Sequence, residues 1–358
     1  MEKFLRYALS ISLGVILSLA LSLAYERPYE WTGIKKIVAV GDLHGDYENF
    51  VEILKGVTLI DESLHWIGGD IHFVQTGDIL DRGPGAREIF DLIKNLEKEA
   101  EEAGGMVHML IGNHEEMNIT GIAIDNPRYV TVDQFLSFLP DKYKKDKEKD
   151  FKKEFEKNSN DSADDRSYET ELRKYWEEVL RKDNRAKLEY TQFFNENYGK
   201  WIIQHNAVIK INDTVFVHGG ISKKYSQMSI KDINDQLRAE LEGFRLALKR
   251  RAALRSKPKI VYDQKGPLWY RGLAQEDEES FAEEVKQILA DLGAKHMVIA
   301  HTPRTGSKIV SEEYVSRFDE SIWVIDTGIS EVYGGFLSAL IIEEGDIWLW
   351  PEGEINEQ

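Results

Sequence analysis

Cysteine is missing from this 358-residue chain, and its absence excludes several kinds of site at once. Without thiols the chain can form no disulfide, no thiolate-bound zinc site and no lipid-modified N-terminal cysteine. Both oxidising and reducing compartments tolerate a cysteine-free chain, so this absence does not fix the location. The length suits one large domain or two ordinary ones, either of which can bury a sizeable core.

Positive charge is also scarce, because 46 Lys and Arg residues are outnumbered by 63 Asp and Glu residues, for a formal net charge of -17. Nucleic-acid binding depends on a basic face, so we expect no nucleic-acid partner. An acidic surface favours solubility, and bound cations would reverse the sign of the charge locally.

A long apolar run occurs near the N-terminus, at residues 7–24. Lys3 and Arg6 precede it, and Ser22-Leu23-Ala24 places small residues where a signal peptidase reads them. A helix over this run would be about 27 Å long and could just span a bilayer. Residues 1–24 are therefore predicted to be a signal peptide or a retained membrane anchor. Either one directs the rest of the chain out of the cytoplasm, to a periplasmic or secreted location. Membrane contact, if the segment stays uncleaved, is expected through residues 7–24 alone.

Strand and helix patterns alternate after residue 33, which predicts an α/β fold. Apolar runs at residues 35–40, 71–76 and 106–111 predict strands, and helical spacing of apolar residues follows the first two. Later segments predict a strand at 214–217, a helix ending at Gly293, strands at 296–300 and 321–325, and a hairpin over 336–350. We expect one domain over residues 34–350. Open α/β sheets place their sites at the carboxyl ends of strands.

Residues 126–204 interrupt this pattern and predict a helical insertion. Its part from 141 to 165 is dense in Lys, Glu and Asp, which is typical of a solvated and partly disordered segment. Apolar residues at helical spacing then predict an amphipathic helix over residues 168–182.

Five short segments each end an apolar run with residues that can bind metal. They are Gly41-Asp42-Leu43-His44-Gly45, Gly77-Asp78-Ile79-Leu80-Asp81-Arg82-Gly83, Gly112-Asn113-His114-Glu115, Val217-His218-Gly219-Gly220 and Ala300-His301-Thr302-Pro303. Oxygen ligands mixed with imidazoles suit two divalent or trivalent ions, with Mn, Fe or Zn favoured over Ca or Mg. Asp42-x-His44 places two side chains on the same side of an extended loop, and Asp78 is the natural bridging carboxylate.

Two such ions, about 3.5 to 4 Å apart, would share a hydroxide poised for in-line attack on phosphorus. The neighbouring residues suit the remaining roles. His114 could protonate the leaving oxygen, and Asp81 could orient His114 and favour its charged form. Arg82 offers a planar fork of donors to phosphate oxygens.

Taken together, the five segments resemble the phosphoprotein phosphatase family of metallophosphoesterases. The Asp326-Thr327-Gly328 and Tyr333-Gly334-Gly335 segments are most similar to its Shewanella-like, bacterial branch. The resemblance implies a two-sheet β-sandwich flanked by helices and a dimetal centre. The implied ligands are Asp42, His44 and Asp78 for one ion, and Asp78, Asn113, His218 and His301 for the other.

The resemblance also implies His114 with Asp81 as the proton-donor pair and Arg82 as a phosphate-binding residue. The family's second phosphate-binding arginine precedes a glycine in a Trp-containing segment, which makes Arg271 the candidate here. Tyr333 is the candidate for a tyrosine that eukaryotic members have near the site. This chain departs from the eukaryotic members at the last ligand, where it has Ala300-His301-Thr302-Pro303 and they have Arg-Ala-His-Gln. The preference of the eukaryotic members for protein substrates therefore cannot be transferred to this chain on the resemblance alone.

Three functions remain open on these residues. The leading expectation is an exported dimetal phosphomonoesterase that acts on phosphorylated Ser, Thr or Tyr in proteins, or on small phosphomonoesters. The second is a nucleotide or dinucleoside polyphosphate hydrolase, because a related branch has similar motifs. The third is a non-enzymatic, membrane-tethered binding module that metal ions stabilise.

Overall fold

The computed structural model describes residues 27–126, 128–158, 165–250, 257–304, 309–311, 315–351 and 355–356. The predicted leader at residues 1–24 lies outside the described residues. Within the described ranges, no helix is both long and apolar enough to cross a bilayer.

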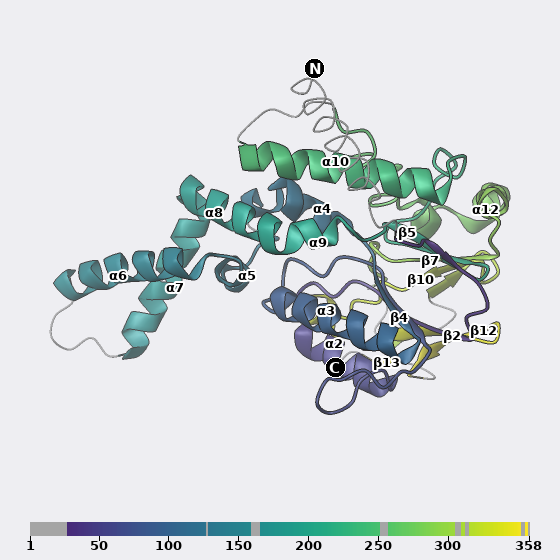
Figure 1. The fold of residues 1–358 in the computed structure, drawn as a ribbon, viewed down its shortest axis with the longest axis horizontal. Coiled ribbons are helices and arrows are strands. Elements are labelled where there is room, and N and C mark those ends of the chain that lie inside the picture. The colour runs from purple at the N-terminus through teal and green to yellow at the C-terminus, as the bar shows by residue number, and fades with distance from the viewer. Residues whose placement is uncertain are drawn as a thin grey trace, which may run out of the picture.

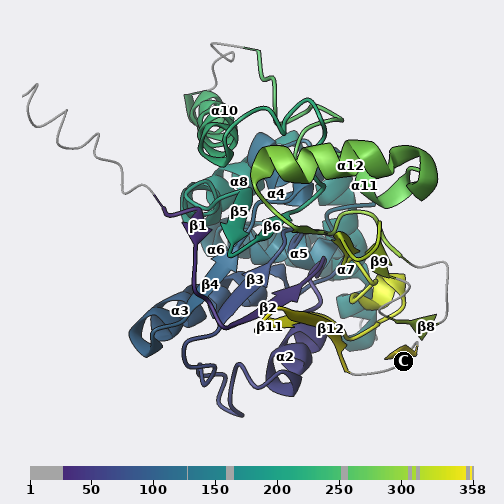
Figure 2. The ribbon, with the colours of Figure 1, turned by 90° about the vertical axis from the view of Figure 1, so that its right-hand side faces the viewer.

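Two mixed sheets stack face to face, as the α/β sandwich expectation requires (Figures 1 and 2). The six-stranded sheet has the order β1 (Glu30–Trp31), β5 (Val208–Ile211), β6 (Thr214–Val217), β7 (His296–Ile299), β10 (Ile322–Val324) and β9 (Ser316–Arg317). The five-stranded sheet has the order β12 (Asp346–Trp350), β11 (Ala339–Glu343), β2 (Lys36–Val40), β3 (His72–Gln75) and β4 (Met106–Met109). A short ribbon pairs β8 (Ile309–Val310) with β13 (Ile355–Asn356).

Side-chain alternation along the strands divides the core into two parts. In β2, Ile37 and Ala39 belong to the cluster between the sheets, whereas Val38 and Val40 belong to the larger cluster that includes the helices. Phe216 and the fully buried Trp323 fill the space between the sheets from the six-stranded side. Because both faces of β2 are buried, its sequence is a continuous apolar run with no polar alternation.

Helices cover the outer faces of both sheets. They are α2 (Tyr47–Gly56), α3 (Ala86–Ala103), α4 (Asn113–Thr120), α10 (Ile230–Arg250), α11 (Gly272–Gln275) and α12 (Glu278–Leu292). Figure 2 shows α2 below the five-stranded sheet and α12 on the opposite side of the molecule. Gly104 and Gly293 end α3 and α12 in the left-handed conformation, and the sequence predicts the helix end at Gly293.

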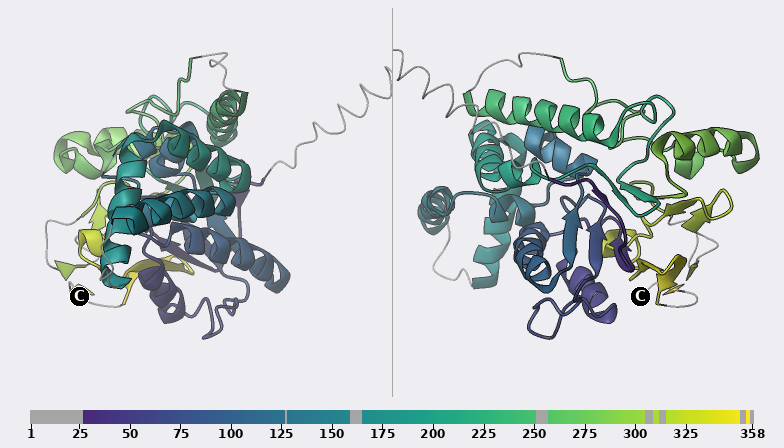
Figure 3. Two further views of the ribbon diagram at one scale, coloured as in Figure 1. Left: turned by 90° about the vertical axis from the view of Figure 1, so that its left-hand side faces the viewer. Right: turned by 45° about the vertical axis from the view of Figure 1, so that its right-hand side comes forward.

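The segment predicted as a helical insertion is mainly helical over its described residues. Its elements are α5 (Val132–Ser137), α6 (Asp141–Asn158), α7 (Asp165–Lys182), α8 (Asn184–Phe194), a π-helical turn at Asn195–Gly199 and α9 (Lys200–Ile202). Helices α6 and α7 extend away from the two sheets (Figures 1 and 3).

The expectation of partial disorder between residues 141 and 165 was wrong for α6. Phe151 and Phe155 lie one helical turn apart and face the rings of Tyr168 and Tyr175 on α7, with centroid distances of 5.0 to 5.6 Å. This aromatic contact gives α6 a partner despite its charge density, because helical stability in proteins comes mainly from packing one apolar face.

Two buried histidines make the stability of the fold depend on pH. His108 Nε2 lies 3.0 Å from His72 Nδ1, and the Trp31 ring contacts both imidazoles. Burial lowers the pKa of His72 to about 4, and burial together with His72 lowers the pKa of His108 well below its usual value. At these two residues the unfolded chain takes up protons below about pH 6.5 while the folded chain does not, so their titration makes acid favour unfolding.

We expect the midpoint of thermal unfolding to fall between pH 7 and pH 5, and to fall less in a His72→Asn protein. Circular dichroism melts at both pH values measure this difference. His65→Asn is the control, because His65 is exposed and pairs with Glu99. An equal fall in the wild-type and His72→Asn proteins would contradict the assignment.

Candidate metal centre

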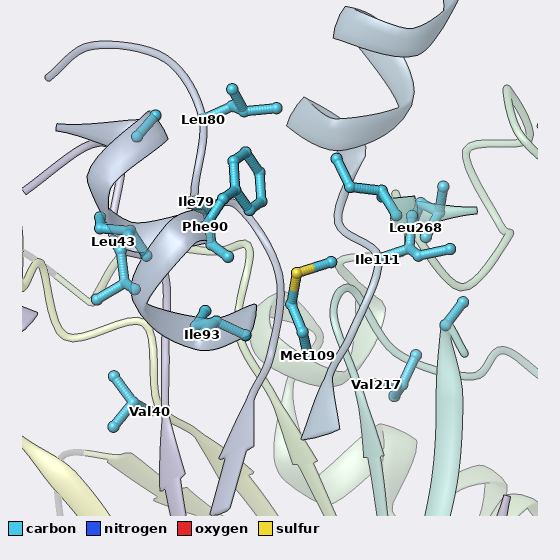
Figure 4. Packing of buried hydrophobic residues seen from close by; sticks show 14 of the residues in the cluster. Val40, Leu43, Ile79, Leu80, Phe90, Ile93, Met109, Ile111, Val217 and Leu268 are labelled. Carbon is cyan, nitrogen blue, oxygen red and sulfur yellow. The ribbon is translucent and has the colours of Figure 1, made fainter. Parts of the chain in front are cut away.

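The predicted ligands lie on loops that follow five strands at one edge of the sandwich. Strands β2, β3 and β4 are mutually parallel, and β6 is parallel to β7. Their carboxyl ends therefore lead into the loops that hold the ligands Asp42, His44, Asp78, Asn113, His218 and His301. Apolar side chains such as Val40, Ile79 and Val217 pack beneath these loops and fix their positions (Figure 4).

The first two motifs meet backbone to backbone. The His44 N–H donates to the Asp78 carbonyl at 2.9 Å, and the Gly45 N–H donates to the Ile79 carbonyl at 2.7 Å. Gly45 has a φ of 72°, and a Cβ there would lie 2.6 Å from the Gly83 carbonyl carbon. Glycine is required at this contact, because any side chain would push the two loops apart.

Asp78 is shared by two groups of potential ligands. In each group, one ligand atom from each residue lies within 4.8 Å of the others. The groups are His44, Asp78 and His114, and Asp78, His218 and His301. The six predicted ligands are all buried, with exposed fractions of 5% or less. This arrangement suits two ions that share one bridging carboxylate.

Asp42 and Asn113 lie against the same cluster. Asp42 Oδ1 is 3.7 Å from His218 Nδ1, and Asp42 Oδ2 is 3.9 Å from His44 Nε2. Asn113 Oδ1 is 2.9 Å from His218 Nε2. The structure thus brings together all six residues that the sequence nominates as ligands.

The protonation states of the cluster fit bound cations. Burial, followed by the neighbouring His114, lowers the pKa of His44 to about 3. Burial and then His218 hold the pKa of His301 well below its usual value, and His301 Nε2 is buried without a hydrogen-bond partner in the described part of the chain. Neutral imidazoles present lone pairs to a metal. Burial and the charges of Asp326 and Asp78 raise the pKa of Asp42, and cations between these carboxylates would relieve that repulsion.

Several of the nominated residues have left-handed backbone conformations. The φ angles are 45° at His44, 57° at Asp78, 71° at Asp81, 73° at Arg82 and 66° at His301. Such conformations cost about 1–3 kcal/mol each for residues other than glycine and persist where surrounding contacts enforce them. Their concentration at these loops is typical of a functional site.

Glu115 enforces the conformation of the Asp78 loop. Its carboxylate accepts hydrogen bonds from the N–H groups of Asp78 at 2.8 Å, Ile79 at 2.9 Å and Gly112 at 2.9 Å. The sequence predicts Glu115 only as a helix cap or an outer residue of the site. In the structure it ties the second motif to the third.

We expect Glu115→Gln to lower the free energy of unfolding by about 2 kcal/mol, because an amide group replaces one of the accepting oxygens. Metal affinity should fall about 10- to 100-fold, since the loop that carries Asp78 loses its support. Denaturant unfolding and metal titration measure the two effects. The matched control is Glu116→Gln: burial raises the pKa of Glu116 to about 8, so its carboxyl is already mostly neutral at pH 7. Equal effects of the two substitutions would contradict the role of Glu115.

His114 and Asp81 form a short hydrogen-bonded pair beside the ligands. His114 Nδ1 lies 2.5 Å from Asp81 Oδ2, and His114 Nε2 lies 3.8 Å from Asp78 Oδ2. Burial opposes the charge on His114, but Asp78 and Asp81 raise its pKa above the usual value. A proton held on Nε2 would therefore lie on the side of the ring that faces Asp78.

Arg82 lies next to His114 between two aromatic rings. Its Nη2 is 3.5 Å from His114 Nε2, and its guanidinium carbon is 4.7 Å from the centroid of Tyr333 and 5.7 Å from that of Tyr129. The Tyr333 ring is also 5.5 Å from the His44 ring. The structure thus places Tyr333 at the site and adds Tyr129, which has no motif in the sequence.

Arg271 lies beside the last ligand, His301. Its Nη1 donates to the His301 carbonyl at 2.7 Å and to Thr302 Oγ1 at 3.0 Å. Both bonds use one nitrogen, which anchors the guanidinium at the His301 loop. This position is compatible with the predicted phosphate contact.

The site also includes residues for which the sequence alone predicts no role. Asp326 follows β10 at the same edge, and burial together with the charge of Asp78 raises its pKa to about 6. The sequence could have indicated Asp326 as a site residue, because Asp326-Thr327-Gly328 follows a predicted strand as the other motifs do. Gln134 and Tyr190, from the insertion, also reach Asp81 or its partners, and no motif marks them.

The family follows from a comparison with known sequences. A family profile described as calcineurin-like phosphoesterase matches residues 35–305. The chain belongs to the calcineurin-like phosphoesterase family. The resemblance found in the sequence is therefore confirmed at family level, and this phosphoesterase is a metal-dependent phosphoester hydrolase.

Similar proteins support the narrower resemblance. This calcineurin-like phosphoesterase is 29% identical to Shewanella-like protein phosphatase 1 of Plasmodium berghei over 322 residues, which cover 86% of this chain and 71% of that one. It is 29% identical to Shewanella-like protein phosphatase 2 of Arabidopsis thaliana over 293 residues, covering 78% and 67%. Its fold matches a cold-active protein-tyrosine phosphatase from a psychrophilic Shewanella species with a TM-score of 0.64 at 26% identity, covering 92% and 82%. The two-sheet sandwich and the Shewanella-like character are thereby confirmed.

Proposed function

We propose that this phosphoesterase hydrolyses phosphate monoesters on proteins at a centre of two metal ions, with phosphotyrosine as the preferred substrate. The observation that carries the proposal is the position of Asp78 in both ligand groups, with His114 and Arg82 directly beside it. Mn, Fe or Zn are the metals that the mixture of carboxylate, amide and imidazole donors favours.

Different side chains of the protein would have different roles in the reaction. When bound, the two metal ions would supply an activated water and neutralise charge on the phosphoryl oxygens. Arg82, beside His114, and Arg271, beside His301, would bind the phosphoryl oxygens. His114 would donate its Nε2 proton to the ester oxygen as the P–O bond breaks, while Asp81 holds Nδ1 and fixes the ring.

The aromatic surroundings of Arg82 support an aryl ester as substrate. Tyr129 and Tyr333 are both half-buried and flank the guanidinium that would bind the phosphate. A phosphotyrosine bound at Arg82 could pack its ring against one of them, whereas a phosphoserine has no ring to place there. The names of the relatives, which include protein phosphatases and a protein-tyrosine phosphatase, support a phosphoprotein substrate.

The test is a substrate panel on metal-loaded protein that contains phosphotyrosine and phosphoserine peptides, a bis-nucleoside tetraphosphate and a phosphodiester. We expect kcat/KM to be highest for the phosphotyrosine peptide. Turnover of the tetraphosphate or the diester alone would overturn the monoesterase assignment. Equal turnover of the two peptides would overturn the preference for tyrosine.

We also propose that the protein is exported, on the strength of Lys3, Arg6 and the apolar run at residues 7–24. Cell fractionation with intact-mass measurement tests this. A periplasmic or secreted protein that begins at Tyr25 would support a cleaved signal peptide, and a full-length protein in the membrane fraction would support an anchor. A full-length protein in the cytosol would refute export.

A further inference from the structure

The helical insertion supplies a side chain that forms two hydrogen bonds with Asp81. Gln134, on α5, donates from Nε2 to Asp81 Oδ1 at 2.8 Å. Its Oε1 accepts the Asp81 backbone N–H at 2.7 Å. Both residues are fully buried. One amide group therefore holds the carboxylate and the strained backbone of the same residue.

Tyr190, on α8, completes a closed ring of hydrogen bonds around this contact. Its hydroxyl donates to Asn118 Oδ1 at 2.7 Å and accepts from Gln134 Nε2 at 2.9 Å. Asn118, on α4, donates from Nδ2 to both oxygens of Asp81 at 3.1 Å. Every polar atom of the ring thus has a partner, although all four side chains are nearly inaccessible to solvent.

The ring fixes the direction in which His114 presents its proton. Asp81 Oδ2 binds His114 Nδ1 at 2.5 Å, and the remaining capacity of the carboxylate is taken by Asn118 and Gln134. The Asp81 carboxylate therefore cannot rotate without breaking several buried hydrogen bonds. A displacement of about 1 Å at a reacting group can cost 10²-fold in rate.

Aromatic packing within the insertion positions Tyr190 and Gln134, its two members of the ring. The Tyr190 ring stacks on Phe135 with a centroid distance of 5.7 Å and meets Phe138 edge-on at 6.0 Å. Phe135 follows Gln134 directly on α5, so one aromatic cluster positions both ring members. The packing of α5 on α8 is thereby linked to the orientation of Asp81.

We propose that Gln134 and Tyr190 are positioning residues for catalysis, through which the helical insertion orients the Asp81–His114 pair for proton donation to the leaving oxygen. The inference rests on the proposed role of His114 as the proton donor. The insertion would thus act on catalysis indirectly, through Asp81 and His114.

A series of esters with different leaving groups can show whether Gln134 and Tyr190 position the proton donor or only stabilise the fold. Metal-loaded full-length protein is assayed with aryl monophosphates whose phenols range from strongly acidic, as in 2,4-dinitrophenol, to weakly acidic, as in phenol. A weakly acidic phenol needs a proton in order to leave, and a strongly acidic one does not. We expect Tyr190→Phe and Gln134→Met to lower kcat for phenyl phosphate about 10-fold or more and to leave 2,4-dinitrophenyl phosphate nearly unchanged.

Tyr198→Phe is the matched control. Tyr198 belongs to the same aromatic cluster, but its hydroxyl contacts Asp91 and Arg87 away from the pair. Equal losses on all esters, or no loss on phenyl phosphate, in the two variants would overturn the inference. Tyr190→Phe removes a single oxygen, so it keeps the test available if Gln134→Met does not fold.

His114→Ala distinguishes this failure from failure of the proposed function. If His114→Ala shows the leaving-group dependence and the two ring variants do not, the positioning role is wrong and the proton donor stands. If His114→Ala shows no such dependence, the proposed mechanism itself is wrong.

Discussion

The Asp78→Asn protein is expected to lose nearly all turnover of an aryl phosphate, with kcat/KM lower by about 10³-fold or more, or ~4 kcal/mol of transition-state stabilisation. Among the described residues, Asp78 is shared by both groups of potential ligands. Asparagine keeps the size of the side chain but removes the charge that two cations would share. The substitution therefore acts on both ions at once, and steady-state kinetics on metal-loaded protein measures the loss.

Asp70→Asn is the matched control for this substitution. Asp70 is exposed and lies just before β3, whereas Asp78 follows the same strand at its other end. The control protein should retain wild-type kinetics. Activity of Asp78→Asn within tenfold of wild type, with its metals still bound, would show that Asp78 does not bridge two catalytic ions.

The His114→Ala protein is expected to lose about 10²- to 10⁴-fold in kcat on esters with poor leaving groups, and little on 2,4-dinitrophenyl phosphate. The physical reason is the loss of the proton that Nε2 would donate. Asp78 and Asp81 raise the pKa of His114 against the effect of burial and so favour the protonated ring. The measurement is kcat across the aryl phosphate series, with metal content determined for each protein.

His65→Ala controls for the loss of an imidazole, because His65 is exposed and bonds to Glu99. It should behave as wild type on every ester. A uniform loss across the series in His114→Ala, with reduced metal content, would instead identify His114 as a ligand. That outcome is a definite alternative, since His114 lies in one of the two ligand groups.

The loops that hold the ligands could be predicted because each is marked by a short stretch of neighbouring residues in the sequence. A buried strand is recognisable as a short apolar run, and the residues that directly follow it lie at the edge of the sheet where the strand ends. His218 and His301 are far apart in sequence, yet His218 directly follows β6 and His301 follows β7 after a single residue. The two-sheet sandwich came from the family resemblance, because the alternation of strand and helix patterns by itself predicts only an α/β fold.

The supports of the site could not be predicted, because they depend on tertiary packing. Gln134 and Tyr190 have no motif and are 56 residues apart, and only the folding of the insertion brings them together. Helix α6 was misjudged for a similar reason: its composition favours disorder, and the contact of Phe151 with Tyr175 on another helix decides the outcome.

Metal stoichiometry tests the central claim most directly. Metal-stripped protein is titrated with Mn²⁺ in a calorimeter, and metal content after dialysis is determined by mass spectrometry. A centre built around Asp78 predicts two equivalents per chain in the wild type and about one in a His301→Ala protein. A single equivalent in the wild type, or an unchanged stoichiometry in His301→Ala, would contradict the dimetal centre.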